Sequence, residues 1–206
     1  MLLPGDPRHH NRRFNLDSIE AHIKNYADPL SSAPLSIDRG QHDLAVAEIE
    51  GARMRGARLW VAGNGGSAAI ADHLLCDWVK GTFTASHPPI HVHPLVSGTA
   101  LLTACANDFG YEASFSRQPE MQAQPSGVLI CISSSANSAN ILAALRKAKT
   151  MRWKTIALIG FSGGESTKLA DIRLHVALHN YGIGEDCHQI LMRNIAQYVY
   201  GRFGVI

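Results

Sequence analysis

The chain has 206 residues, 46% of them hydrophobic, which fits one compact domain with a sizeable core. Its 19 Lys and Arg nearly balance its 17 Asp and Glu, so a net charge of +2 gives no basic footprint for sequence-independent nucleic-acid binding. No apolar run approaches the roughly 20 residues of a membrane helix. We therefore expect a soluble protein with neither nucleic acid nor a membrane as a direct partner.

Four cysteines are spread through apolar runs of the chain, with no CxxC pair among them. A free thiol in such a run behaves as a small hydrophobe. This usage is typical of a reducing compartment rather than of a disulfide scaffold, so we expect a cytoplasmic protein. The four residues are Cys76, Cys105, Cys131 and Cys187.

The start of the chain divides into a leader and two helices. Residues 1–13 hold three turn-forming residues and a polar cluster, which predicts a flexible leader before a single domain over residues 14–206. Apolar residues at helical spacing predict a first helix over residues 14–27, which Pro29 and Pro34 should end. The same spacing predicts a second helix over about residues 37–57.

Beyond these helices, five short apolar runs alternate with helical stretches of about a dozen residues. Most of the runs lack a clean polar alternation, as expected for strands that are covered on both faces. The pattern predicts an α/β fold, a three-layer doubly wound sandwich with a five-stranded parallel sheet, preceded by the N-terminal helices. The strands are expected at residues 59–62, 90–96, 128–132, 155–159 and 172–177, and the helices at 68–80, 100–106, 111–118, 139–151 and 184–200.

The loop after the first strand, residues 63–67, has the sequence Gly-Asn-Gly-Gly-Ser and leads into an alanine-rich helix. Glycines let the backbone approach a ligand closely, and the first turn of the helix presents unpaired N–H groups to an anion. An ordinary tight turn also fits the loop. Because Asn64 and Ser67 are interleaved with three glycines, we favour binding of a phosphate or a sugar hydroxyl.

The loop after the third strand, residues 133–138, contains four serines and one asparagine ahead of the next helix. Capping that helix needs only one of these side chains. The surplus favours a phosphate ester, which accepts hydrogen bonds from hydroxyls and backbone N–H groups while the helix dipole offsets its charge. Two such loops at one sheet edge suit a sugar phosphate better than a dinucleotide, because no acidic ribose-binding position is evident.

These motifs, in this order and spacing, resemble the SIS (sugar isomerase) domain family, and within it the phosphoheptose isomerases and the relatives that associate with the replication initiator. Besides the two loops, the matching stretches are residues 102–104, 107–112, 115–118, 154–160, 163–164 and 170–172, and the last helix. The resemblance implies the SIS fold, a homotetramer and a sugar-phosphate site that neighbouring subunits complete.

The resemblance also implies the residues that bind the substrate. In the family, serines at three positions of the second loop hold the phosphate, and residues from the first loop and from residue 108 surround the sugar. Ser134 stands where Thr is usual, and Ala136 stands where Gly is usual, so Ala136 should resist a positive φ. The substrate-binding candidates are Asn64, Gly65, Ser67, Asp108, Ser133, Ser134, Ser135 and Ser138.

The implied reaction interconverts sedoheptulose 7-phosphate and glycero-manno-heptose 7-phosphate through an enediol, with a Glu as base and a His as acid. This chain has Asp77 at the Glu position, about 1 Å shorter in reach, and a misplacement of that size can cost roughly 100-fold in rate. Arg193 takes the His position and cannot exchange a proton near neutral pH. As a hypothesis, Asp77 is the base, Arg193 steadies the oxyanion, and Glu185 or His188 moves the second proton.

Some family members bind zinc here, through a His one turn before the base and a Gln on the last helix. His73 and Glu185 occupy these two positions, so His73, Asp77 and Glu185 form a candidate three-ligand set. Alternatively, Glu185 and Arg193 form a mere salt bridge. Two functions therefore remain: an aldose–ketose isomerase, or a non-catalytic sugar-phosphate sensor or protein-association module that has lost the acid histidine.

Overall fold

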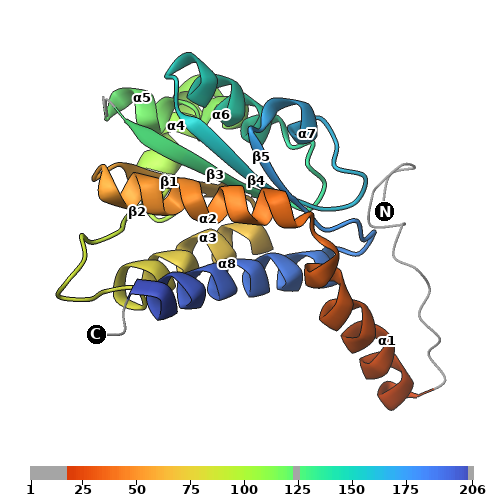
Figure 1. The fold of residues 1–206 in the computed structure, drawn as a ribbon. Coiled ribbons are helices and arrows are strands. Elements are labelled where there is room, and N and C mark those ends of the chain that lie inside the picture. The colour runs from red at the N-terminus through yellow and green to blue at the C-terminus, as the bar shows by residue number, and fades with distance from the viewer. Residues whose placement is uncertain (1–17, 123–125, 204–206) are drawn as a thin grey trace.

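A computed structural model describes residues 18–122 and 126–203 of the chain (Figure 1). Its five parallel strands form one sheet with the order β2-β1-β3-β4-β5, which confirms the predicted doubly wound α/β architecture. The predicted leader lies outside the described residues. The strands are β1 Arg58–Gly63, β2 His91–Pro94, β3 Gly127–Ser133, β4 Lys154–Ile159 and β5 Ile172–His175.

The helices form two layers around the sheet (Figure 1). Helices α2, α3 and α8 cover one face, α4 to α7 lie over the other, and α1 projects away from the body. Within the described residues, no helix combines the length and the apolar character needed to cross a membrane. The helices are α1 Ile19–Ser32, α2 Arg39–Met54, α3 Gly66–Leu75, α4 Thr99–Phe109, α5 Arg117–Met121, α6 Ala139–Thr150, α7 Ser166–Leu169 and α8 Tyr181–Phe203.

Successive side chains of each central strand enter opposite halves of the core. Leu59 and Val61 of β1 belong to the hydrophobic cluster that includes residues of α2, α3 and α8, whereas Trp60 and Ala62 belong to the cluster that includes α6. Because both faces are buried, apolar residues are needed at every position, and the predicted runs lack a polar alternation for this reason.

Two helix predictions are wrong at their boundaries. Helix α1 begins after Ser18, whose hydroxyl accepts the Ala21 N–H at 3.1 Å, and it continues through Pro29 to Ser32. A proline removes only its own backbone N–H donor, and the carbonyl of Pro29 still accepts the N–H of Ala33.

The second wrong boundary is in residues 111–118, which are not one helix, because a short 3-10 turn, Tyr111–Ala113, precedes α5. Helix α5 starts at Arg117 and so keeps Pro119 in its first turn, where a proline is tolerated.

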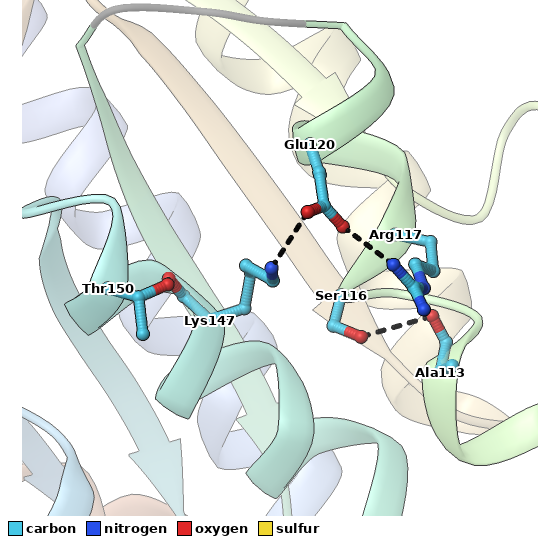
Figure 2. A network of polar contacts seen from close by, with 6 residues as sticks. All are labelled: Ala113, Ser116, Arg117, Glu120, Lys147 and Thr150. Carbon is cyan, nitrogen blue, oxygen red and sulfur yellow. Dashed lines mark hydrogen bonds and ion pairs between the residues drawn. The ribbon is translucent and has the colours of Figure 1, made fainter.

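A carboxylate with two cationic partners fixes α5 against α6 (Figure 2). Glu120 accepts hydrogen bonds from Lys147 of α6 and from Arg117 of its own helix, each at 3.1 Å. These hydrogen bonds, the one from Lys147 first, hold the pKa of Glu120 below its ordinary value. The network is open to solvent, so we assign it a role in the register of α5 on α6 and little net stability.

Candidate functional site

A cavity of about 110 Å³ lies where the carboxyl ends of β1 and β3 meet. At this point the chain order reverses across the sheet. β1 lies between β2 and β3, so the chain passes from β1 to β2 in one direction and continues with β3, β4 and β5 in the other. Doubly wound sheets bind ligands at such a reversal. The two loops predicted to bind substrate therefore lie together, as the sequence indicated. The cavity is lined by Asn64, Ser67, Ile132, Ser133, Ser134, Ser135, Ser138, Tyr181 and Glu185.

The serine loop has a strained but well-held backbone. Ala136 adopts φ +56°, the left-handed conformation that the Gly-to-Ala departure should resist, at a cost of roughly 1–2 kcal/mol. Its N–H donates to Ser133 Oγ at 3.2 Å, and its carbonyl accepts both the N–H and the hydroxyl of Ser166, at 3.0 and 2.8 Å. These contacts preform the loop ahead of α6, as expected for a ligand-binding segment.

One hydroxyl of this loop is buried without a protein partner. Ser134 is 3% exposed and lines the cavity, and its Oγ makes no hydrogen bond to any described residue. Leaving a buried hydroxyl unpaired costs about 1–3 kcal/mol, and an acceptor atom of a ligand in the cavity would satisfy the Ser134 hydroxyl. Ser138, the N-cap residue of α6, makes no capping bond with its side chain either. Hydroxyls beyond those that the helix needs are therefore available to a ligand.

The glycine loop holds a carboxylate of the protein itself. Glu185 of α8 lies against Gly66 and accepts hydrogen bonds from the backbone N–H and the hydroxyl of Ser67, at the start of α3. Any side chain at Gly66 would collide with this carboxylate. Burial raises the pKa of Glu185 above its ordinary value, and the two hydrogen bonds from Ser67 offset part of the rise. Glu185 is thus a titratable group at the cavity, and the serine loop is the better place for a phosphate.

A second polar cluster lies further from the sheet edge, where Arg193 of α8 reaches across to His73 of α3 and to Asp77. Asp77 belongs to a short π-helix, Cys76–Lys80, that continues from α3. Nη2 of Arg193 lies 2.6 Å from Nε2 of His73, and its Nε donates to Asp77 Oδ2 at 3.2 Å. Nε2 of His73 also lies 3.2 Å from Asp77 Oδ2, so the three side chains form one cluster. The cluster is half open, with 52% of the Arg193 side chain and 45% of the His73 side chain exposed.

Similarity to known proteins decides the family. The sequence model of the SIS domain matches residues 39–160, more than half of the chain. The chain belongs to the SIS domain family. Phosphoheptose isomerase from Campylobacter concisus is 31% identical over 183 residues, which cover 89% of this chain and 93% of that protein. Phosphoheptose isomerase from Mycobacterium bovis (strain BCG / Pasteur 1173P2) is 34% identical over 144 residues, 70% and 73% of the two chains. The structure of phosphoheptose isomerase GmhA from Neisseria gonorrhoeae matches with a TM-score of 0.80 at 25% identity, over 89% and 97% of the two chains.

The zinc set suggested for this SIS chain does not assemble. Glu185 is bound at the start of α3, whereas His73 and Asp77 lie further along and contact Arg193. Among the residues that the structure describes, no three His, Cys, Asp or Glu side chains gather closely enough to hold a metal ion. The guanidinium of Arg193 cannot ligate a metal. It places a fixed positive charge beside His73 and Asp77, the two other candidate ligands. The alternative salt bridge between Glu185 and Arg193 is not formed either, since the two side chains have different partners.

Three other predicted site residues of the SIS chain are not among the residues that line the cavity. His188 is fully buried, and burial lowers its pKa to about 4, although the carbonyl of Ile159 opposes this shift. Gly65 is the N-cap residue of α3 with φ +55°, and Asp108 of α4 accepts a hydrogen bond from Asn107. Of the two groups proposed for the second proton, the structure therefore places Glu185, and not His188, at the cavity.

Two further residues at the site were not predicted from the sequence. Tyr181 begins α8 and lines the cavity. Asn140, the second residue of α6, is 3% exposed and pairs its amide with that of Asn64. The one sequence signal for Asn140 is its place beside Ile141 on the apolar face of a helix. An amide that is buried on such a face needs polar partners, and this need points to a neighbouring polar group.

Proposed function

We propose that this protein is an aldose–ketose isomerase that interconverts sedoheptulose 7-phosphate and glycero-manno-heptose 7-phosphate through an enediol. The observation that carries the proposal is the serine-lined cavity at the N-terminus of α6, with the unpaired hydroxyl of Ser134 in its wall. Hydroxyls and helix N–H groups together suit a phosphate ester. The names of the relatives from Campylobacter concisus and Mycobacterium bovis support the seven-carbon substrate.

In this proposal the two polar clusters have different roles in binding and catalysis. The serine loop binds the phosphate, and Glu185, whose pKa burial raises above its ordinary value, moves the proton on oxygen. Asp77 is the base for the carbon proton, and Arg193 stabilises the enediolate as a permanent cation. Asp77 and Arg193 do not line the cavity of their own protomer. We therefore assign them to a site shared between neighbouring protomers, which suits their partial exposure.

The proposed assembly is a homotetramer. Helix α1 carries Ile19 and Ile23 at 75% and 60% exposure, and Leu35 beyond it is 86% exposed beside an apolar groove against α8. A monomer rarely exposes such a set, which a second copy of the chain would bury. Light scattering at micromolar concentration should give four times the mass of one chain. A stable monomer would leave Asp77 and Arg193 without the neighbouring cavity and would contradict the shared site.

Removing two hydroxyls of the serine loop should weaken substrate binding selectively. In the double variant Ser133→Ala with Ser135→Ala, we expect the Kd for sedoheptulose 7-phosphate to rise at least about tenfold, because hydrogen bonds to a charged phosphate are lost. Calorimetric titration measures this change. Ser86→Ala, an exposed serine outside the cavity, is the control and should bind as the wild type does. Equal wild-type affinity for the phosphorylated and unphosphorylated ketose would refute a phosphate site.

Arg193 favours a second candidate function. A SIS protein without the acid histidine can keep its phosphate loop and act as a sugar-phosphate sensor or a protein-association module. Such a protein would bind the ketose phosphate without converting it, so turnover separates the two functions. The four free cysteines support the expected reducing, cytoplasmic location for either function.

A further inference from the structure

Two asparagine side chains join the loops that form the cavity. Asn64 directly follows β1, and Asn140 lies in the first turn of α6. Their amides form a reciprocal pair, in which each Nδ2 donates to the other Oδ1 at 2.9 Å. A third group joins this pair, since the hydroxyl of Tyr111 donates to Asn64 Oδ1 at 2.8 Å.

The orientation of the pair is set by the backbone of α6. The N–H of Ile141 donates to Asn140 Oδ1 at 3.0 Å, and a backbone N–H can face only an acceptor. The Nδ2 of Asn140 must therefore point to Asn64, whose Oδ1 in turn faces Asn140. One backbone donor thus fixes both amides.

A count of hydrogen-bonding groups then shows what Asn64 has left for a ligand. Both lone pairs of its Oδ1 are used, by Asn140 and by Tyr111, and one of its two Nδ2 protons is bound to Asn140. One N–H remains, on a residue that lines the cavity. Asn64 therefore meets a ligand as a donor and never as an acceptor.

We propose that Asn140 and Tyr111 are positioning residues that hold Asn64 as a one-way donor to an acceptor oxygen of the sugar. This inference rests on the proposed sugar-phosphate function of the same cavity. Asn140→Ala removes the amide that pairs with Asn64 and adds no charge beside the phosphate loop. The Asn64 amide then loses the partner that fixes its direction and no longer presents a fixed donor to the ligand. The variant should fold, because alanine has the highest helix propensity.

The test is a double-mutant cycle read as Kd and as kcat/KM for sedoheptulose 7-phosphate, with the Kd for inorganic phosphate as the structural readout. Asn140→Ala should weaken sugar-phosphate binding roughly tenfold and leave phosphate binding unchanged. In an Asn64→Ala background the same change should have an effect under about twofold, because Asn140 acts through Asn64. If the losses from the two changes multiply in the double variant, or if Asn140→Ala binds the sugar phosphate as the wild type does, the proposal is overturned.

A second variant decides the matter if Asn140→Ala also loses inorganic phosphate, which would signal damage to α6. Tyr111 is 57% exposed, so Tyr111→Phe removes one hydroxyl without disturbing the core. It should weaken sugar-phosphate binding several-fold in the wild type and have no effect in Asn64→Ala. Tyr198→Phe, an exposed tyrosine of α8, is the matched control. Equal losses from Tyr111→Phe in both backgrounds would reject the positioning role. A wild type that binds but does not turn over the sugar would reject the isomerase and leave the binding cycle decisive.

Discussion

Changing Asp77 to Asn should lower the kcat for sedoheptulose 7-phosphate by roughly 10²–10⁴-fold, the usual contribution of a positioned base. The amide is nearly isosteric with the carboxylate but cannot take a proton. Its oxygen can still accept the hydrogen bond from Arg193 Nε, so the cluster should keep its geometry. Steady-state rates give the loss, and a calorimetric Kd on the same preparation should stay within about threefold of the wild type.

Asp72→Asn is the matched control for this variant. Asp72 lies on α3, just ahead of the π-helix that carries Asp77, and accepts a hydrogen bond from Ser97. It is not part of the Arg193 cluster or of the cavity lining. It should keep near-wild-type turnover. Full activity in Asp77→Asn would remove Asp77 from the mechanism and leave Glu185 as the base to be tested.

Changing Arg193 to Gln should lower kcat by roughly 10²–10³-fold, the effect of removing a preorganised donor from a developing oxyanion. The loss should fall on kcat rather than on KM, because the charge that Arg193 stabilises develops only in the transition state. Arg193→Lys should give an intermediate rate, since an ammonium keeps the charge but lacks the fork that contacts both His73 and Asp77. Because Arg193 supplies the positive charge, a chelator should leave the wild-type rate unchanged.

Arg55→Gln is the control for the loss of a guanidinium. Arg55 pairs with Glu48 at the surface and lies outside the site. Its loss should not change turnover. If Arg193→Gln keeps the wild-type kcat, or if a chelator abolishes wild-type turnover, Arg193 is not the cation that the reaction uses.

The strands were predictable because their environment leaves a clear mark on the sequence. Each strand of a covered parallel sheet needs apolar side chains on both faces, as Trp60 and Val61 show. Helix ends were less predictable. Pro29 removes only one backbone hydrogen bond, so α1 continues past it to Ser32. The local sequence does not show whether the rest of a helix is stable enough to tolerate the loss of that hydrogen bond.

The site was predictable to the extent that topology alone decides it. The carboxyl ends of parallel strands share one edge, so the loops after β1 and β3 had to meet. The partners of Glu185, Arg193 and Asn140 depend on how α8 packs beside α3 and on where α6 begins. These contacts join residues more than 70 positions apart, and no local periodicity encodes them.

The most direct test of the central claim is the conversion of sedoheptulose 7-phosphate by the wild-type protein in D₂O, with a chelator present and followed by NMR. The account predicts that an aldose phosphate forms and carries solvent deuterium at carbon 2, because an enediol exchanges its proton with a base. A protein that binds the ketose phosphate but converts neither it nor any other phosphorylated ketose would contradict the isomerase and identify a sugar-phosphate binding module.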